Sequence, residues 1–417
     1  MSRRRVLITG IGAITPLGRS VSAIWGRLVS GESSVRAISL PNAATGVSLC
    51  VPGAPVEGAL EPLQRSIAPL VDRFTWLGVL AARDAVVDSN LNLVDRNRCG
   101  VSSGTCMGGI TETERGFDAI FVQKRPRTHP FTVVRTMYNG PAAFIAQEHE
   151  LTGPTLCYST TCSSSSVAIG EAMRQIRHGY ADAMIAGGSE TLLTYSAFNI
   201  WSSGHLLAAV SDLPAQSCRP FSANRDGTAL GEGAVFLILE SEDHARSRGA
   251  RVYAELAGYG ISSDCAHVTQ PSVDGQGRPM QLALDDAGAT PDEVDYIQAH
   301  GTGTRLNDVT EVKAIKQVFG AHAMKLAVSS CKAQVGHMVG AAGAMGALIG
   351  ALAIHHAEIP PTAFLNEVDP ECDLDFVPNV GRRSTKLDVV MANAFGFGGT
   401  GASLVFRKCD SDQFDKQ

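Results

Sequence analysis

Short apolar runs alternate with amphipathic segments along this chain. The run VLITG at residues 6–10 predicts a buried strand, and the following GIGAITPLG predicts a strand-to-loop turn. A strand followed by a glycine-rich turn is expected within 99–109, a strand that runs into a glycine turn within 181–190, and another buried strand in 231–241. In contrast, residues 163–178 place apolar side chains at i, i+4 and i+7, which predicts a helix that ends at Gly179. This alternation favours a layered α/β fold.

The pattern restarts past the middle of the chain. RVYAELAGYGISSD repeats the order of RRRVLITGIGAITP, with basic residues, a strand and a glycine turn, about 250 residues later. The sequence therefore predicts two similar halves, residues 1–250 and residues 251–417. The echo is faint and does not establish a repeat alone.

Residues 338–354, MVGAAGAMGALIGALAI, form the one long uncharged run. A transmembrane helix is one interpretation, because small residues recur at four-residue spacing. However, the run is short for a membrane span, and glycine and alanine outnumber the larger aliphatic residues. The sequence favours a buried central helix that packs closely on another helix, and predicts no membrane span.

The start of the chain resembles a signal peptide, a twin-arginine signal or a dinucleotide-binding loop. The apolar run is interrupted by glycines, no cleavage site follows closely, and Pro16 stands where a nucleotide-binding helix would run. A first buried strand is therefore the favoured interpretation. The ten cysteines are scattered, as expected for free thiols in the cytoplasm.

Composition excludes some functions. The formal net charge of −6 provides no basic surface for nucleic acid. There is no CxxC motif and no cysteine–histidine spacing of a zinc site, so no metal site is expected.

One cysteine stands apart in the run TTCSSSS at residues 160–166. Cys162 directly precedes the predicted helix of residues 163–178, where unsatisfied N–H groups and the helix dipole favour a thiolate. Small neighbours leave the sulfur accessible. The alternative is an ordinary buried cysteine in a serine-rich helix cap, and this stretch alone does not decide between them.

Three later stretches favour a nucleophile. QAHGTGTRLNDVTE places His300 at a strand end, although it could simply cap a turn. SSCKAQVGHMVGAAG contains Lys332 and His337, and His337 near a helix N-terminus is expected to stay neutral and to donate to an enolate. NAFGFGGTGASLVF carries Phe395 and Phe397 on a glycine-rich turn, which is either half of an oxyanion hole or a plain hairpin.

Together these motifs resemble the β-ketoacyl-acyl carrier protein synthases, most closely the synthase II type and the related polyketide ketosynthases. VLITGIGAITPLG, RPFSANRDGTALGEGA, AHGTGT, SSCKAQVGHMVGAAG, PECDLDFVPN and NAFGFGGT occur in family order and cover nearly the whole chain. The resemblance implies a thiolase fold, in which two βαβαβαββ-type halves form five αβαβα layers. It also implies a homodimer, and a heterodimer with a related subunit is an alternative.

The resemblance also implies the roles of the site residues. Cys162 would accept the acyl group, and His300 and His337 would stabilise the enolate that a malonyl thioester leaves after decarboxylation. Lys332 would order this cluster, while the N–H groups of Cys162 and Phe397 would form the oxyanion hole and the Phe397 ring would gate access. No cofactor is implied, because the substrates arrive on the phosphopantetheine of acyl carrier protein. The expected substrate contacts are Thr302, Thr304 and Thr269 on the arm, and Met107, Phe198 and Trp201 in the acyl pocket.

Several positions depart from the family pattern. Gly346 replaces a glutamate that helps to order the lysine, and Gly401 replaces an asparagine of the gating turn. Asn307 replaces a glycine, which is expected to be mild because asparagine tolerates a positive φ. Trp201 is bulky for a pocket position. These departures suggest a specialised fatty-acid or type II polyketide pathway. Two matched carboxylates are expected to be structural: Asp308 and Glu311.

Three other functions are alternatives, and the residues argue against the first two. A non-catalytic partner subunit resembling chain-length factors would lack the active cysteine. A thiolase would need a second cysteine, which FGFGGTG does not supply. An acyltransferase would keep Cys162 without decarboxylating an extender, and Gly346 and Gly401 leave that possibility open.

Overall fold

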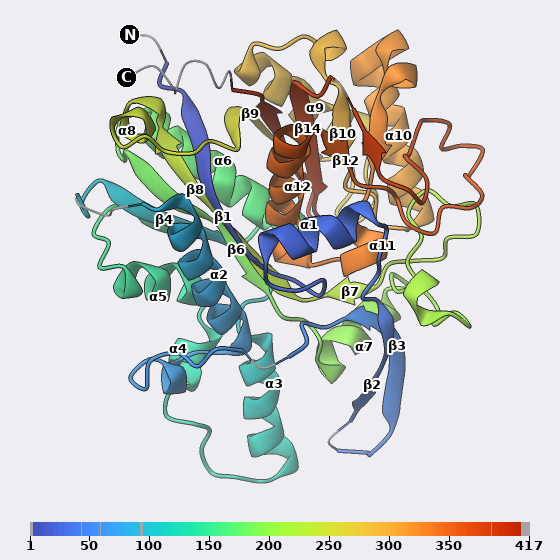
Figure 1. Cartoon of the computed structure of the whole chain (residues 1–417). Helices are drawn as coiled ribbons and strands as arrows, with labels where there is room; N and C mark the ends of the chain where they lie inside the picture. Colours follow the sequence, from blue (N-terminus) through green and yellow to red (C-terminus); the bar gives the residue numbers. More distant parts are fainter. Residues whose placement is uncertain (1–2, 43, 59, 92–94, 385, 410–417) are drawn as a thin grey trace.

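The computed structural model describes residues 3–42, 44–58, 60–91, 95–384 and 386–409. A ten-stranded mixed sheet runs through it in the order β11-β10-β14-β15-β9-β1-β8-β6-β4-β5 (Figure 1). Its strands are β1 (Val6–Ile14), β4 (Cys99–Gly104), β5 (Thr155–Tyr158), β6 (Ala183–Glu190), β8 (Gly233–Ser241), β9 (Ala254–Ser263), β10 (Tyr296–Gln298), β11 (Ala327–Ser329), β14 (Val389–Phe395) and β15 (Thr400–Arg407).

The two ends of this sheet have the same connectivity. In chain order the groups are β1, β4, β5, β6, β8 and β9, β10, β11, β14, β15. In each group the fifth strand pairs antiparallel with the first and with the fourth, while the second, third and fourth strands are parallel to one another. The groups meet where β1 pairs briefly with β9, Leu7 opposite Glu255 and Ile8 opposite Ala254. This repeated topology confirms the expected α/β thiolase-like fold.

Helices complete five layers around the two half-sheets (Figure 1). α2 and α5 cover the outer face of the first half-sheet, α6 and α12 lie between the half-sheets, and α9 and α10 cover the outer face of the second. Their bounds are Arg73–Ser89 (α2), Gly140–Glu148 (α5), Ser164–Arg177 (α6), Val273–Ala287 (α9), Arg305–Phe319 (α10) and Ala342–His356 (α12). The helix predicted for residues 163–178 is therefore confirmed as α6, and Gly179 follows it with a φ of +78°.

The apolar run at 338–354 forms a short 3₁₀ turn, η7 (Val339–Ala341), followed by α12. The segment Val339–His356 has a mean hydropathy of 1.4, and 83% of it is buried. Its glycines let neighbours approach the helix backbone, since a Cβ on Gly343 would lie 2.2 Å from Ser166 Oγ. A Cβ on Gly350 would lie 2.6 Å from the Phe406 ring. This apolar segment is therefore a core helix.

Two strands extend further than the sequence predicted. β1 runs through GIGAI to Ile14 instead of turning after Gly10, and it pairs with β8 up to Ile14 opposite Ala234. A Cβ on Gly12 would lie 2.0 Å from Ala81 O, so this glycine allows α2 to pack directly on the strand. β6 likewise continues through its two glycines to Glu190. The glycines mark close packing within these strands and not their ends.

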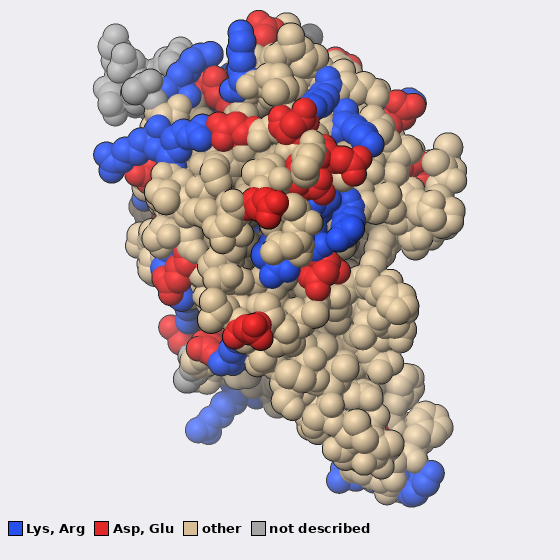
Figure 2. Space-filling view, turned by 90° about the vertical axis from the view of Figure 1, so that its right-hand side faces the viewer, with Lys and Arg blue, Asp and Glu red and all other residues tan. Residues whose placement is uncertain are grey.

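Smaller elements surround this core. They are α1 (Val21–Val29), β2 (Arg36–Pro41), β3 (Ser48–Ala54), α3 (Ile110–Phe117), α4 (Thr132–Thr136), α7 (Tyr195–Ser203), β7 (Leu230–Gly231), α8 (Glu242–Ser247), α11 (Lys332–Val335), β12 (Glu358–Ile359) and β13 (Arg382–Arg383). The projection at the lower right of Figure 2 carries few charges except at its tip, and α3 and the following segment project at the bottom of Figure 1. Apolar side chains are exposed there, including Phe117, Phe121 and Val133.

Candidate active site

Cys162 lies in a strained turn between β5 and α6. The turn, η3 (Thr161–Ser163), places Thr161 at a φ of +55°, which is unusual for a β-branched residue. Hydroxyl groups hold it in place: Ser164 Oγ donates to Thr161 O at 2.6 Å, and Thr160 N donates to Ser164 Oγ at 2.9 Å. Part of the serine run therefore maintains the conformation of the cysteine turn.

The same turn is attached to the hairpin between β14 and β15. Thr161 Oγ1 donates to Phe397 O at 2.9 Å, and Ser163 Oγ donates to Thr400 O at 3.1 Å. A Cβ on Gly396 would lie 2.1 Å from Thr161 Oγ1, so the two backbones meet where a larger residue would not fit. The structure thus brings the C-terminal glycine-rich hairpin against Cys162.

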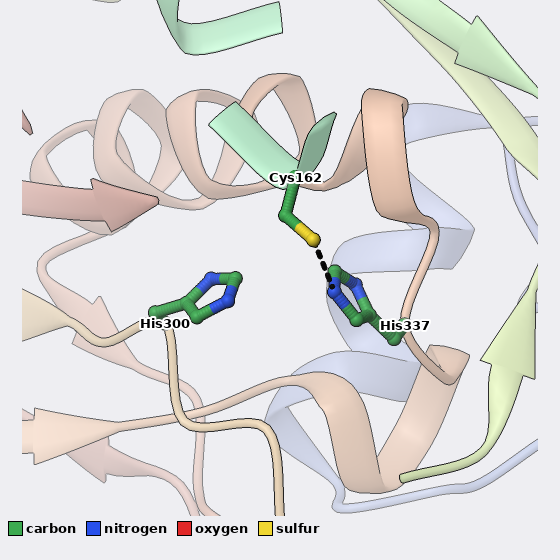
Figure 3. Close-up of side chains that lie close together, drawn as sticks. All are labelled: Cys162, His300 and His337. Atoms are coloured by element: carbon green, nitrogen blue, oxygen red, sulfur yellow. Dashed lines mark hydrogen bonds between the residues drawn. The ribbon is translucent and has the colours of Figure 1, made fainter. Parts of the chain in front are cut away.

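Cys162, His300 and His337 converge in the interior (Figure 3). His337 Nε2 lies 3.1 Å from Cys162 Sγ, and the two imidazole rings meet edge to face with centroids 5.4 Å apart. Each of these three residues is at most 5% exposed. Figure 3 shows that they come from different segments: the turn before α6, the loop after β10 and the loop between α11 and α12.

The hydrogen bonds determine which nitrogen of each ring carries the proton. Val339 N donates to His337 Nδ1 at 3.2 Å, so Nδ1 is the acceptor and Nε2–H points at the cysteine sulfur. Lys332 Nζ donates to His300 O and lies 3.5 Å from His300 Nδ1, which also leaves the proton on Nε2. Both histidines thus present N–H donors to the same space.

Burial dominates the electrostatics of the site. It lowers the pKa of His300 and of His337 well below the usual value, and the charge of Lys332 acts in the same direction. Burial also raises the pKa of the Cys162 thiol to about 12, against the opposing effects of Lys332 and of the N–H groups of Cys162 and Phe397. The resting site therefore holds a thiol and two neutral rings, whereas the helix position alone favoured a thiolate.

Among the described residues, the ligand atoms of Cys162, His300 and His337 lie within 4.8 Å of one another, close enough to bind a metal ion. A metal on His337 Nε2 would require the proton to move to Nδ1, where it would oppose the N–H of Val339. The hydrogen bonding therefore favours a donor site over a metal site.

A cavity of about 470 Å³ leads to the cysteine. The predicted residues that line it are Cys162, Trp201, Thr269, His300, Thr302, Thr304, His337 and Phe397. Trp201 lies beside both His337 and Phe397, with ring centroids 6.0 Å and 6.3 Å away. Met107 and Phe198 do not line this cavity, and pack in an apolar cluster that includes Cys162 and Trp201. Two of the three predicted acyl contacts thus lie outside this cavity, and the third, Trp201, lines it.

Asp308 and Glu311 support the loop that carries His300. Glu311 accepts from the backbone N–H groups of His300 and Gly301, each at 2.8 Å. Asp308 accepts from the N–H of Thr302 at 3.0 Å and pairs with the buried Arg225. Both carboxylates accept hydrogen bonds from backbone N–H groups, and neither lines the cavity.

The structure shows the space and the contacts around three positions that depart from the family pattern. A Cβ on Gly346 would meet ordinary contacts at 3.5 Å, next to a cavity of about 10 Å³ that Lys332 also lines. A Cβ on Gly401 would lie 3.0 Å from Pro279, so an asparagine there would require a shift. Asn307 lies in the first turn of α10 without a positive φ, so the reason given for its mildness was wrong. Its Oδ1 instead accepts from Gln276 at 3.0 Å.

One buried group near the cysteine was missed from the sequence. Glu190 ends β6, is fully buried, and accepts from the backbone N–H groups of Cys106, Met107 and Gly340. A signal was present, because a carboxylate at the end of the apolar strand AMIAGGSE needs donors wherever that strand is buried.

A buried cysteine beside two neutral N–H donors, in a two-half α/β fold, is typical of enzymes that form thioesters on a cysteine. The comparisons are more specific. Residues 3–245 match the β-ketoacyl synthase N-terminal domain, and residues 253–366 match the C-terminal domain. The chain belongs to the β-ketoacyl synthase family.

Relatives match over almost the whole chain. It is 40% identical to 3-oxoacyl-acyl-carrier-protein synthase 2 of Coxiella burnetii, covering 98% of this chain and 99% of that protein. It is also 40% identical to nodulation protein E of Rhizobium meliloti, covering 97% and 99%. Among solved structures, the ishigamide ketosynthase/chain length factor superposes with a TM-score of 0.90 at 32% identity, covering 98% of this chain and 100% of that one.

Proposed function

We propose that this protein is a β-ketoacyl-acyl carrier protein synthase that elongates an acyl chain by decarboxylative Claisen condensation. The observation that carries this proposal is the geometry around Cys162. Its sulfur lies 3.1 Å from the protonated Nε2 of His337, and the ring of His300 stands opposite.

The first half-reaction transfers an acyl group. Cys162 sulfur attacks the carbonyl of an acyl thioester, and the oxyanion is stabilised by the N–H groups of Cys162 and Phe397. The carbon–sulfur bond to the carrier breaks, and the cysteine proton ends on the leaving sulfur. Because the resting group is a thiol, the His337 N–H contributes by stabilising negative charge as it develops on sulfur.

The second half-reaction forms the new carbon–carbon bond. A malonyl thioester loses carbon dioxide, and its enolate oxygen accepts hydrogen bonds from Nε2–H of His300 and of His337. The enolate carbon then attacks the acyl group on Cys162, the carbon–sulfur bond to the cysteine breaks, and the cysteine takes up a proton from solvent. Two neutral donors suit this step, because they stabilise the enolate oxygen and cannot quench the carbanion as readily as a charged acid would.

The cavity suits a substrate delivered on a long arm. Thr302 and Thr304 hydroxyls lie 2.8 Å apart on its wall, and Thr269 stands exposed at its edge. These hydroxyls can bond the amides of phosphopantetheine on an acyl carrier protein. The reaction itself needs no metal or redox cofactor.

We place the enzyme in the cytoplasm, where carrier-bound acyl chains would reach it, and expect a dimer. β5 is an edge strand, and the chain between β4 and β5 exposes the apolar side chains of Phe117, Phe121 and Val133. A homodimer is the first expectation, and a heterodimer with a related subunit is the alternative. The likeness to a ketosynthase named with its chain length factor is the observation that supports the heterodimer.

A specialised fatty-acid or polyketide pathway is the finer proposal. Its support is chemical: the Trp201 ring lies beside His337 and Phe397, and glycine stands at positions 346 and 401 near the lysine and in the hairpin. Relatives with synthase and nodulation names are equally similar to this chain, so identity does not decide the pathway.

Intact-protein mass spectrometry tests the proposal. Wild type and Cys162→Ala are mixed with acyl carrier proteins bearing different chains, followed by malonyl-carrier protein. We expect acylation of wild type alone, then a product two carbons longer with loss of carbon dioxide. Transfer of the acyl group to an alcohol or amine without decarboxylation would identify an acyltransferase instead. No acylation by any chain would contradict the proposal.

A further inference from the structure

Glu190 connects two turns that meet beside the cysteine. Its Oε2 accepts from Cys106 N at 2.5 Å and from Gly340 N at 3.2 Å, and its Oε1 accepts from Thr105 Oγ1 at 3.2 Å and from Met107 N at 3.3 Å. All four donors are neutral groups. One carboxylate therefore bonds both the turn after β4 and the η7 turn before α12.

The η7 turn determines the orientation of His337. Val339, the first residue of η7, donates its N–H to His337 Nδ1, and this bond directs Nε2–H at Cys162. Gly340, the next residue, donates to Glu190. A Cβ on Gly340 would lie 2.4 Å from Cys106 N and 2.5 Å from Glu190 Oε2, so η7 packs directly on the turn after β4.

The turn after β4 carries Met107, which packs in the apolar cluster with Cys162. A displacement of η7 relative to this turn would move the Val339 N–H away from the His337 ring. Either ring nitrogen could then carry the proton, and the donor that faces sulfur would be lost for part of the time.

We propose that Glu190 is a positioning residue: by holding η7 against the turn after β4, it maintains the His337 tautomer that points Nε2–H at Cys162. The consequence for acyl transfer rests on the function proposed above, whereas the tautomer itself does not. The role belongs to the shape and hydrogen bonds of the side chain and not to its charge.

Burial of this carboxylate is unfavourable, and burial raises the pKa of Glu190 to about 7. The titratable groups that sense its charge are the thiols of Cys106, Cys157 and Cys162 and the phenol of Tyr138. The pKa of each is raised, so they are neutral at pH 8. Measurements at pH 8 thus examine Glu190 with its carboxyl group mainly ionised and with the surrounding thiols and phenol neutral.

Two substitutions separate shape from charge. Glu190→Asp keeps the charge but shortens the side chain, so it cannot reach both turns. Glu190→Gln removes the charge, yet its amide oxygen can accept from Cys106 and Gly340 while its NH₂ group donates to the Thr105 hydroxyl. Only the 3.3 Å bond from Met107 N is lost. Glu311→Asp is the matched control, because Glu311 is equally buried but bonds the His300 loop.

The first measurement is the ¹⁵N chemical shifts of the imidazole nitrogens at pH 8, with His337 assigned through His337→Asn. We expect a single Nε2–H tautomer for His337 in wild type, Glu190→Gln and Glu311→Asp, and mixed tautomers in Glu190→Asp. The second is the rate of Cys162 acylation, which should fall about 10- to 100-fold in Glu190→Asp and less than about fivefold in Glu190→Gln. If Glu190→Asp does not fold, Gly340→Ala separates the same turns and should give the same mixed tautomers.

A wild-type His337 tautomer and acylation rate in folded Glu190→Asp would overturn the proposal. Slowing in Glu190→Gln but not in Glu190→Asp, with unchanged tautomers, would also overturn it, in favour of a role for the charge. If wild type accepts no acyl chain, the proposed function fails, but the ¹⁵N shifts still decide the positioning role.

Discussion

At the scale of single residues, two opposing effects act on Cys162. Its position before α6 and its backbone N–H donors favour a thiolate, while burial disfavours any charge there. Burial is the larger effect, and it raises the pKa of the thiol to about 12. The N–H of His337 then becomes important during the reaction, because it stabilises charge that is absent in the resting state.

Alkylation by iodoacetamide tests this balance. We expect the rate at Cys162 to rise about tenfold per pH unit from pH 7 to pH 9, because the thiolate fraction grows by that factor well below the pKa. Peptide mass spectrometry gives the rate, and the exposed Cys265 reports reagent reactivity in the same sample. A rate that levels off by pH 8 would mean that Cys162 is largely ionised at neutral pH.

His300→Ala tests the division of labour between the two histidines. The variant loses one enolate donor but keeps the His337–Cys162 contact, so we expect release of carbon dioxide from malonyl-carrier protein to slow about 100- to 1,000-fold. Acylation of Cys162 should continue within about tenfold of wild type. Labelled carbon dioxide and intact mass measure the two steps, and equal loss of both would contradict separate roles.

At the scale of elements, α12 owes its central place to glycines of different kinds. Gly343 and Gly350 lie where neighbouring groups contact the helix backbone, whereas Gly346 has ordinary space around its Cα. Glycine otherwise weakens a helix, so close packing compensates at the first two positions but not at the third.

Gly343→Ala and Gly346→Ala form a matched pair for urea unfolding. The first methyl group meets Ser166 at 2.2 Å, so the free energy of unfolding should fall by about 1–3 kcal/mol. The second finds contacts at 3.5 Å, so it should rise by up to about 1 kcal/mol through helix propensity. Equal effects of the two substitutions would show that glycine spacing does not govern the packing of α12.

At the scale of the whole molecule, two half-sheets with the same connectivity bring their loops together at one site. The first half supplies Cys162, and the second supplies His300, His337 and the hairpin of Phe397. We propose residue 250, shortly before β9, as the boundary between these halves. Two buried carboxylates, Glu190 and Glu311, accept hydrogen bonds from backbone N–H groups and form no salt bridge within the part of the chain that the structure describes. This affects the pH dependence of stability.

Burial raises the pKa of Glu190 and of Glu311 from 4.5 to about 7. Between these values the folded state binds more protons than the unfolded state, so stability is lost as pH rises. We expect the free energy of unfolding to fall by about 1 kcal/mol per group from pH 6 to pH 8. Urea titrations should show this fall in wild type and a flatter profile in Glu190→Gln/Glu311→Gln. An unchanged profile would mean that these carboxyl groups titrate elsewhere.

Sequence patterns predicted the elements better than their limits. The helical period of residues 163–178 located α6 to within about a residue, because its apolar face is a local property. The predicted ends of β1 and β6 were wrong. The glycines read as turns lie inside these strands, where they allow close packing by partners that are distant in the chain. Glu190 was missed for the same reason, since its donors come from the turn after β4 and from η7.

The sequence by itself determined the alternation of strands and helices, the candidate nucleophile, both histidines and the family, because these depend on local patterns and ordered motifs. Only the tertiary structure decided how the groups meet. The Nε2–Sγ contact, the tautomers fixed by Val339 and Lys332, and the thiol form of Cys162 all arise between segments far apart in the chain. Burial and hydrogen-bond direction exist only once those segments pack together, and they determine the chemistry available to the same residues.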